Sequence, residues 1–174
     1  QRPAGVIFGK PVTFHRFTQA YGVDYAYTGQ VSRAQPLESA PAPLREVLRS
    51  LLAVAPLSEY NSALVNWYET DLVCRPKSMP DYMGAHSDDE RCLRVGYPIV
   101  SLSWCAPAAS HVRRFRLKPK PHTADGLIPE GWRGDGRIGG AVRALGDGDL
   151  LVMGGECQRT HTHELLKPGR SQAE

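Results

Sequence analysis

The residues with the clearest chemical potential are histidines and a carboxylate in two segments that lie far apart in the sequence. Residues 86–90 read His-Ser-Asp-Asp-Glu, and residues 160–163 read Thr-His-Thr-His. In an extended segment, side chains two residues apart project to the same side, so His86 and Asp88 can reach one ion. A histidine from the second segment would complete a set of two imidazoles and one carboxylate. This set is the facial triad of non-haem iron(II) oxygenases.

A facial triad leaves the opposite positions of an octahedral ion open. Those positions accept a bidentate co-substrate and dioxygen, which is what oxygen activation requires. A His-x-Asp pattern followed by a later histidine also occurs by chance in a chain with six histidines. The metal hypothesis therefore depends on whether the rest of the sequence supports the same chemistry.

The composition is that of an ordinary folded protein. At 174 residues the chain can bury about 70% of its unfolded surface around one core. Its four cysteines are widely spaced without a Cys-x-x-Cys pair, which favours a reducing, intracellular setting over a zinc knuckle or a disulfide framework. A net charge of +3 is too small to identify a nucleic-acid-binding protein. No apolar run has the length of a membrane span, so no membrane association is predicted.

The elements that must position these side chains are mostly short strands. Apolar residues at helical spacing predict a helix over residues 41–55. Short apolar runs bounded by turn residues predict strands at 63–68, 99–104, 115–117 and 149–153. Residues 69–83 and 118–145 are predicted to be mobile surface insertions. This pattern favours a mainly β fold with flanking helices, for which a jelly roll with the metal ligands at its mouth is one solution.

Four blocks, in order along nearly the whole chain, resemble the AlkB family of Fe(II)- and 2-oxoglutarate-dependent dioxygenases. The blocks lie at residues 6–29, which include Val-Ile-Phe-Gly-Lys and Tyr-Ala-Tyr-Thr-Gly, and at residues 60–68, 86–103 and 148–163. The resemblance implies a single dioxygenase domain over 1–174. Within it, residues 1–35 would form the nucleotide-recognition region and residues 60–174 a double-stranded β-helix, or jelly-roll, core.

The resemblance also implies which residues hold Fe(II) and the co-substrate 2-oxoglutarate. The family's spacing selects His163 rather than His161 as the distal histidine. The family anchors the far carboxylate of 2-oxoglutarate with an arginine about a dozen residues beyond that histidine. This position falls just beyond Glu174, so the last core strand is expected to be missing from the printed sequence. The implied metal ligands are His86, Asp88 and His163, and the implied co-substrate ligands are Asn66 and Tyr68.

The DNA-repair branch of this family acts on methylated bases that are flipped out of the helix or already single-stranded. The lesions 1-methyladenine and 3-methylcytosine carry positive charge, so nearby carboxylates favour them. An apolar wedge, aromatic walls, acidic groups and backbone-contacting cations are implied as the substrate-binding set: Phe8, Arg16, Tyr25, Tyr27, Asp89, Glu90 and Arg159. Each also has an ordinary structural interpretation, as a strand, core, turn or surface residue.

The predicted activity is oxidative demethylation of alkylated DNA, and of RNA as a further substrate, by a monomeric enzyme that uses Fe(II), 2-oxoglutarate and dioxygen. The expected location is intracellular, in the nucleus of a eukaryote or the cytoplasm of a bacterium. One alternative is an RNA N6-methyladenine demethylase, whose neutral substrate would gain less from the acidic pair. Another is a nucleic-acid-binding module that kept the fold and lost catalysis. A small-molecule or protein hydroxylase would leave the N-terminal block unexplained.

Overall fold

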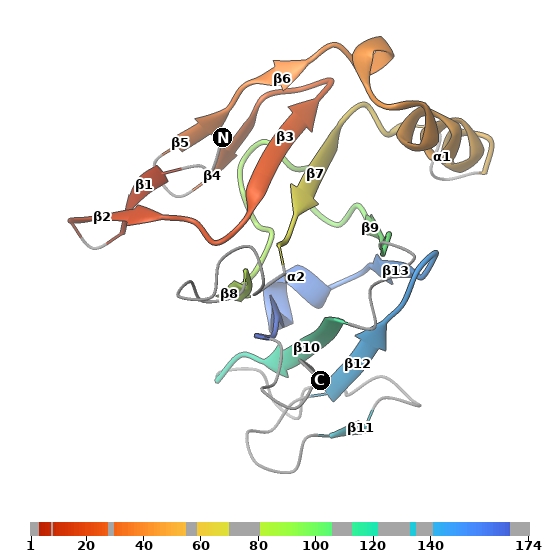
Figure 1. The fold of residues 1–174 in the computed structure, drawn as a ribbon. Coiled ribbons are helices and arrows are strands. Elements are labelled where there is room, and N and C mark those ends of the chain that lie inside the picture. Colours follow the sequence, from red (N-terminus) through yellow and green to blue (C-terminus); the bar gives the residue numbers. More distant parts are fainter. Residues whose placement is uncertain are drawn as a thin grey trace. The chain divides into compact units, whose positions relative to one another are not determined.

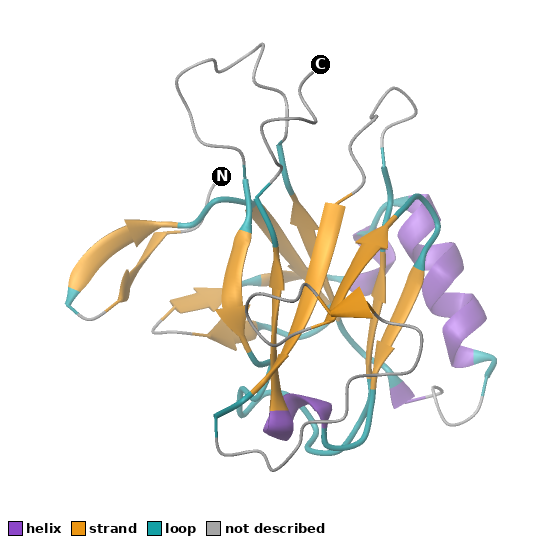
Figure 2. Cartoon of the chain, turned by 90° about the horizontal axis from the view of Figure 1, so that it is seen from below, coloured by secondary structure: helices purple, strands orange, loops and turns teal. Residues whose placement is uncertain are grey.

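The computed structural model describes residues 4–7, 9–27, 30–54, 59–69, 81–105, 113–121, 133–134 and 141–167, drawn in colour in Figure 1. The chain separates into two compact units, residues 1–67 and residues 68–174. Strands are the commonest regular element in the described residues of both units (Figure 2). The prediction of a mainly β fold with flanking helices is confirmed. No helix among these residues has the length and apolar character needed to cross a membrane.

The first unit contains three small sheets and one long helix. Its sheets pair β1 with β2, β4 with β5, and β3 with both β6 and β7. Gly22 lies at the end of β3 with a φ of 87°, and a Cβ there would approach the main-chain oxygen of Asn61 to 2.1 Å, so no other residue fits. The elements are β1 (Ala4–Ile7), β2 (Lys10–Thr13), β3 (Phe17–Tyr21), β4 (Tyr25–Tyr27), β5 (Gln30–Ser32), β6 (Ala34–Gln35), the 3-10 helix η1 (Leu37–Ser39), α1 (Ala42–Leu52) and β7 (Ala63–Trp67).

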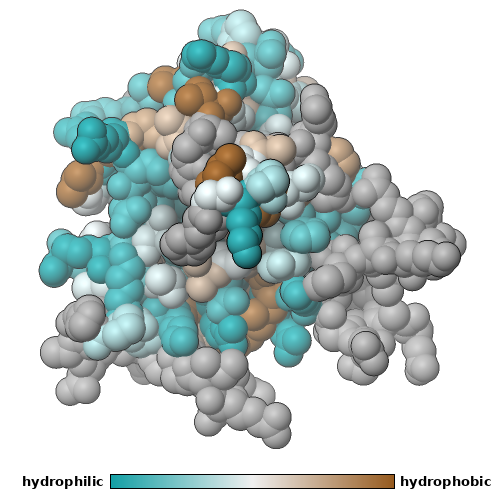
Figure 3. Space-filling view, turned by 90° about the vertical axis from the view of Figure 1, so that its left-hand side faces the viewer, coloured by the Kyte–Doolittle hydropathy of each residue, from teal (hydrophilic) through white to brown (hydrophobic). Residues whose placement is uncertain are grey.

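Helix α1 confirms the helix predicted over residues 41–55. It begins after Pro41 and has a further proline in its first turn, where a missing N–H has no cost. Leu48 is buried, and Leu44 and Val47 are partly buried on the same side. In the face that Figure 3 shows, apolar residues are scattered among hydrophilic ones. Exposed valines of the first unit include Val6 and Val31.

The second unit is built around a five-stranded antiparallel sheet with the order β11-β12-β10-β14-β8, and a separate pair, β13-β9. Strand β14 is the last of the described strands in sequence yet lies between β10 and β8, so long-range pairing holds the sheet together. The elements are β8 (Met83–His86), β9 (Ile99–Leu102), β10 (Arg113–Pro119), β11 (Arg133–Gly134), β12 (Ala141–Leu145), β13 (Leu150–Met153), α2 (Cys157–Thr160) and β14 (His161–Leu165).

The core of the second unit is apolar and lies on one face of this sheet. Alternate residues of β10, Phe115 and Leu117, are buried with Leu145 and Met153. The side chains of Ile99, Leu151 and Cys157 pack against this group. The strands predicted at 63–68, 99–104 and 149–153 are confirmed as β7, β9 and β13, and the strand predicted at 115–117 is longer and spans all of β10.

The prediction that residues 118–145 form a surface insertion is wrong at both ends. Strand β10 continues through Pro119, and Ala141 and Leu145 are buried residues of β12. Ladder pairing with β10, in which Leu145 faces Arg113, holds β12 in the sheet and overrides its weak apolar pattern. Of the two predicted insertions, residues 70–80, 122–132 and 135–140 lie outside the described residues.

Candidate metal centre

Strands β8 and β14 bring the two histidine-containing segments together. They pair antiparallel with His86 opposite His163, and Asp88 follows two residues after the end of β8. The Nε2 atom of His86 lies 3.4 Å from Asp88 Oδ1, and the Nε2 atom of His163 lies 3.4 Å from Asp88 Oδ2. The potential ligand atoms of the three residues all lie within 4.8 Å of one another. Residues separated by most of the second unit's sequence therefore present one convergent donor set.

Hydrogen bonding and stacking orient both imidazoles. The Nδ1 atom of His86 lies 2.8 Å from the main-chain oxygen of Gly84, so Nδ1 donates a proton and Nε2 keeps its lone pair for an ion. His163 is only 3% exposed. Its ring stacks on Phe115, with centroids 5.5 Å apart and planes 18° apart. Each ring therefore turns its Nε2 atom toward Asp88.

The main chain around Asp88 is fixed by the segment that leads into β14. The Asp88 N–H donates to Gln158 Oε1 at 2.9 Å, and the Ser87 hydroxyl donates to the main-chain oxygen of His161 at 2.8 Å. Gln158 belongs to α2, the short helix that immediately precedes β14. Each of these two hydrogen bonds joins residues at least 70 positions apart in the sequence. Together they fix the position of the Asp88 main chain, and with it the carboxylate, relative to the strand that carries His163.

The electrostatics of the centre favour a cation. Burial raises the pKa of Asp88, but the two imidazoles that face its carboxylate, His163 more than His86, outweigh burial and hold that pKa well below its usual value. Burial, with the Asp88 charge as a smaller cause, raises the pKa of the Cys157 thiol. At neutral pH the site thus presents a carboxylate, whereas the Cys157 thiol stays protonated.

The donor set fits a first-row divalent metal. Two ligand atoms bound at right angles through bonds of about 2.1 Å, the length of a zinc–imidazole bond, lie about 3.0 Å apart. The two nitrogen–oxygen separations of 3.4 Å are slightly wider, so a small inward rotation of the side chains would close the set around an ion. They are also longer than good hydrogen bonds. Two imidazoles and one carboxylate on one side of an ion are the ligands typical of iron(II) oxygenase sites.

Three of the predicted substrate-binding residues form an aromatic cluster in the first unit. The ring centroid of Tyr27 lies 5.4 Å from that of Tyr25 and 5.7 Å from that of Phe14. The Arg16 guanidinium carbon lies 5.5 Å from the Phe14 ring centre and 5.7 Å from the Tyr27 ring centre. Phe14 was missed in the sequence, although its position two residues before Arg16 was the available signal. Phe8, the predicted wedge, lies outside the described residues.

This cluster contains polar atoms that are buried without a partner. The Tyr27 hydroxyl and Arg16 Nε have no hydrogen-bond partner in the part of the chain that the structure describes. A buried polar atom without a partner is costly, and such atoms are common where a ligand binds. The same holds for Oδ1 of Asn66, a predicted co-substrate ligand on β7.

The remaining predicted residues have mixed surroundings. Asp89 is exposed, with a carboxylate oxygen 4.0 Å from Lys120 Nζ, and Glu90 is partly buried. Arg159 is exposed and forms an ion pair with Glu156 on the same short helix. The exposed pair stabilises little by itself, so Arg159 can exchange this partner for another anion.

Tyr68, the second predicted co-substrate ligand, lies at the start of the second unit. Its hydroxyl donates to Met83 Sδ at 3.4 Å, and the guanidinium carbon of Arg113 lies 5.6 Å from its ring centre. Arg113 was not singled out in the sequence, because one arginine within the run Arg-Arg-Phe-Arg carries no signal that distinguishes it from its neighbours.

Comparison with known proteins gives two findings. The family model described as the 2OG-Fe(II) oxygenase superfamily matches residues 9–174. The DNA oxidative demethylase ALKBH2 of Arabidopsis thaliana is 31% identical over 140 residues, which cover 76% of this chain and 40% of that protein. The chain therefore spans about two fifths of the length of this curated relative.

Proposed function

Because the chain belongs to the 2OG-Fe(II) oxygenase superfamily and is AlkB-like within it, we propose that it oxidatively removes methyl groups from the ring nitrogens of nucleobases. The observation that carries this proposal is the convergence of His86, Asp88 and His163 on one point. Fe(II), with 2-oxoglutarate and dioxygen, would supply the oxidation of the methyl C–H bond, after which the base releases formaldehyde. The proposed substrates are 1-methyladenine and 3-methylcytosine in DNA, with RNA as a second substrate.

At the metal, the residues of the chain itself would orient the ligands and limit the access of water. The Gly84 carbonyl keeps His86 in the tautomer that can bind through Nε2. Phe115 covers one face of the His163 ring, and the almost complete burial of that histidine limits water on its side of the site. Such fixed geometry keeps a bound methyl group close to the reacting centre and lowers the entropic part of the barrier.

The proposed nucleotide-binding surface is the aromatic cluster of the first unit, with Phe14, Arg16, Tyr25 and Tyr27. Aromatic faces and a guanidinium plane stack on a base that has left the helix, largely without regard to its identity. The Tyr27 hydroxyl and Arg16 Nε, which have no partner among the described residues, would bond to that nucleotide. Phe8, as a wedge, and Arg159, as a backbone contact, complete the proposal.

Preference for cationic lesions is assigned to Asp89 and Glu90. A positively charged methylated base is attracted to these carboxylates, whereas neutral N6-methyladenine is not. This charge argument ranks the repair activity above an RNA N6-methyladenine demethylase. A binding module without catalysis is the remaining alternative, and it predicts binding of methylated strands with no methyl loss.

The test is mass spectrometry of short single- and double-stranded oligonucleotides that carry one methylated base. The protein is incubated with Fe(II), 2-oxoglutarate and air, and the loss of a methyl group is followed. Asp88→Asn, which keeps the side-chain shape, should abolish methyl loss. Glu46→Gln, the same chemical change on the exposed surface of α1, should leave it unchanged. Methylated strands that bind without losing methyl groups, with the metal in place, would refute the enzymatic proposal.

A further inference from the structure

Lys120 is a partly buried cation beside the metal centre. It directly follows β10, and its main-chain N–H donates to the carbonyl oxygen of Thr160 at 2.8 Å. Its Nζ atom donates to the carbonyl oxygen of Gln158 at 2.9 Å. Gln158 is also the residue whose side chain accepts the Asp88 N–H. Two hydrogen bonds therefore hold the lysine against the segment that positions a metal ligand.

The ammonium of Lys120 also faces the carboxylate of Asp89. Its Nζ atom lies 4.0 Å from Asp89 Oδ2, and the two side chains are 28% and 71% exposed. This separation is too long for a hydrogen bond, but it brings two opposite charges together. Asp89 directly follows the ligand Asp88 and is one of the two carboxylates assigned above to the attraction of cationic lesions. A positive charge therefore lies next to a group that is proposed to attract positive charge.

A structural role alone does not account for the charge of Lys120. The hydrogen bond to the Gln158 carbonyl needs only an N–H donor, which an uncharged amide also provides. An ion pair with a partner as exposed as Asp89 adds little stability. For a bound base the charge matters more, because an ammonium close to Asp89 offsets part of that carboxylate's attraction for a cation and repels the cation directly.

Arg159, a cation of the same region, differs from Lys120 in this respect. Its guanidinium pairs with Glu156 on α2, so its charge is largely balanced within that helix. Its side chain is 77% exposed, and water and salt screen such a charge strongly. Lys120 is more deeply placed and is screened less, so its charge acts more fully on the acidic pair.

We propose that Lys120 is a specificity-determining residue that lowers the site's preference for positively charged bases over neutral ones. This inference rests on the proposed function, and the resemblance to the AlkB family assigns no role to Lys120. The carboxylates of Asp89 and Glu90 attract a cationic base, and Lys120 sets how strongly they do so. The lysine thereby widens the range of methylated bases that the site accepts, so that it includes neutral ones.

The experiment compares two single-stranded oligonucleotides that differ in the charge of one base. One carries 3-methylcytosine, which is cationic, and the other carries 3-methylthymine, a neutral pyrimidine methylated on the same ring nitrogen. Fluorescence anisotropy gives the ratio of their Kd values on protein loaded with Mn(II), which takes ligands similar to those of Fe(II); without 2-oxoglutarate no methyl group is lost. Lys120→Met should raise the preference for 3-methylcytosine about two- to tenfold, the range for one unit charge near a partly exposed site. Weaker attraction of phosphates affects both strands equally and cancels in the ratio.

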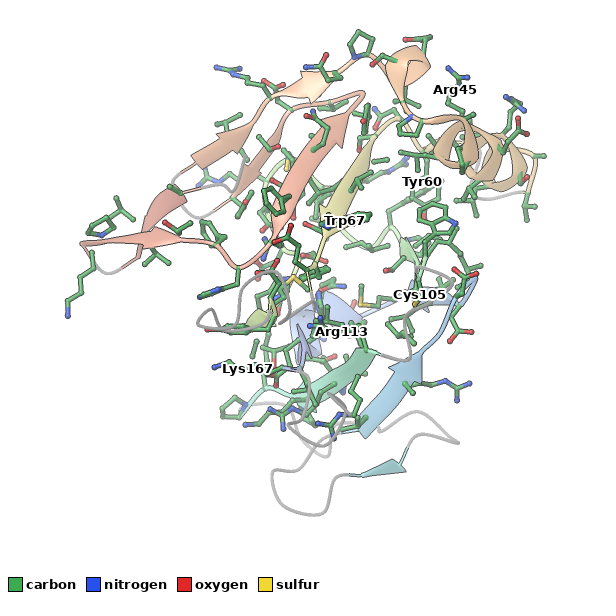
Figure 4. All side chains as sticks on the ribbon, viewed as in Figure 1. Arg45, Tyr60, Trp67, Cys105, Arg113 and Lys167 are labelled. Carbon is green, nitrogen blue, oxygen red and sulfur yellow. The ribbon has the colours of Figure 1, made fainter. Side chains whose placement is uncertain are left out.

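Two control variants separate the charge of Lys120 from other effects. Lys120→Arg keeps the positive charge and should keep the wild-type ratio. Lys167→Met removes the same charge beyond the other end of β14, where Lys167 (labelled in Figure 4) lies over the ring of Tyr82. Lys120 bonds to Thr160, which directly precedes that strand, so the two lysines lie at opposite ends of it. Lys167→Met should therefore also keep the wild-type ratio.

Each outcome decides between the inference and the function on which it rests. An unchanged ratio in Lys120→Met, or an equal rise in Lys120→Arg or Lys167→Met, overturns the inference and leaves the demethylase proposal to its own assay. A wild-type protein that binds neither methylated strand more tightly than the unmodified strand overturns both. If circular dichroism shows that Lys120→Met does not fold, Lys120→Gln replaces it. Its amide keeps a donor for the Gln158 carbonyl, so an unchanged ratio there overturns the inference equally.

Discussion

Replacement of Phe115 by alanine should damage both the core and the metal centre, and the two effects can be separated. Phe115 is 6% exposed in the core of the second unit and stacks on the ring of His163. Leu145 is 8% exposed in the same core, but it lies on β12, which β10 separates from β14. Leu145→Ala is therefore a matched control, because it opens a cavity in the same core without removing the ring that supports the histidine.

Both variants should lower the free energy of unfolding of the metal-free protein by about 3 kcal/mol, the usual cost of a large-to-alanine change in a core. For a chain of this length that corresponds to a fall in Tm of about 6–12 °C. Urea denaturation followed by tryptophan fluorescence measures the free energy. Titration of the native protein with Mn(II) measures metal affinity, which should fall about tenfold in Phe115→Ala, as when a group that orients a ligand is removed, and should not change in Leu145→Ala.

Equal weakening of metal binding by the two variants would show that core loosening, and not ring stacking, controls His163. Unchanged metal affinity in Phe115→Ala, with the expected loss of stability, would refute the role given to the stacking contact.

Three further changes test other features of the second unit. Arg116 and Glu164 form a 2.7 Å ion pair, and their side chains are only 15% and 16% exposed. Each of Arg116→Met and Glu164→Met should leave the other charge buried without its partner, so the double variant should lose less stability than the two single losses added together, by a coupling free energy of about 1–3 kcal/mol. A double-mutant cycle of denaturation free energies measures this coupling, and additive effects would contradict it. Gln158→Ala removes the acceptor of the Asp88 N–H and should lower the free energy of unfolding by about 1 kcal/mol. It should also weaken Mn(II) binding, measured by calorimetry, about tenfold. An unchanged Mn(II) affinity would contradict the role of Gln158 in positioning Asp88. Burial raises the pKa of Cys157, and only the thiolate reacts with iodoacetamide. The reagent should therefore label Cys157 slowly at neutral pH, faster as the pH rises, and rapidly in urea. Fast labelling of Cys157 in the native protein at pH 7 would contradict the raised pKa.

The grouping of His86, Asp88 and His163, which the structure brings together, was accessible from sequence because it depends on local geometry and on a family spacing. His86 and Asp88 share one side of an extended segment whatever the rest of the fold does, and the spacing in the distal block distinguished His163 from its neighbour His161. Helix α1 was equally accessible, since its apolar residues repeat at the helical period. The strands at 63–68, 99–104 and 149–153 were also accessible, because each is a short apolar run bounded by turn residues.

The features that sequence could not supply depend on tertiary pairing. Strand β12 carries an exposed arginine between its buried ends, and only its ladder with β10 makes it a strand. Arg113 donates to the main-chain oxygens of Asp81 and Leu166 only in the folded protein, because these residues lie in distant parts of the sequence. Phe14 becomes part of an aromatic cluster only when Tyr27 folds against it.

The pairing of β8 with β14 also has a consequence for the order of folding. The contact from Ser87 to His161 closes a loop of 74 residues, and contacts of such high sequence separation form late and slow folding. The donor set of His86, Asp88 and His163 cannot form until β14 has entered the sheet, so metal affinity would report formation of this sheet. By mass action, metal at about 100 times its Kd would then add about 2.7 kcal/mol to that unit's stability. Metal supply would set how long the folded unit persists as well as whether it can react.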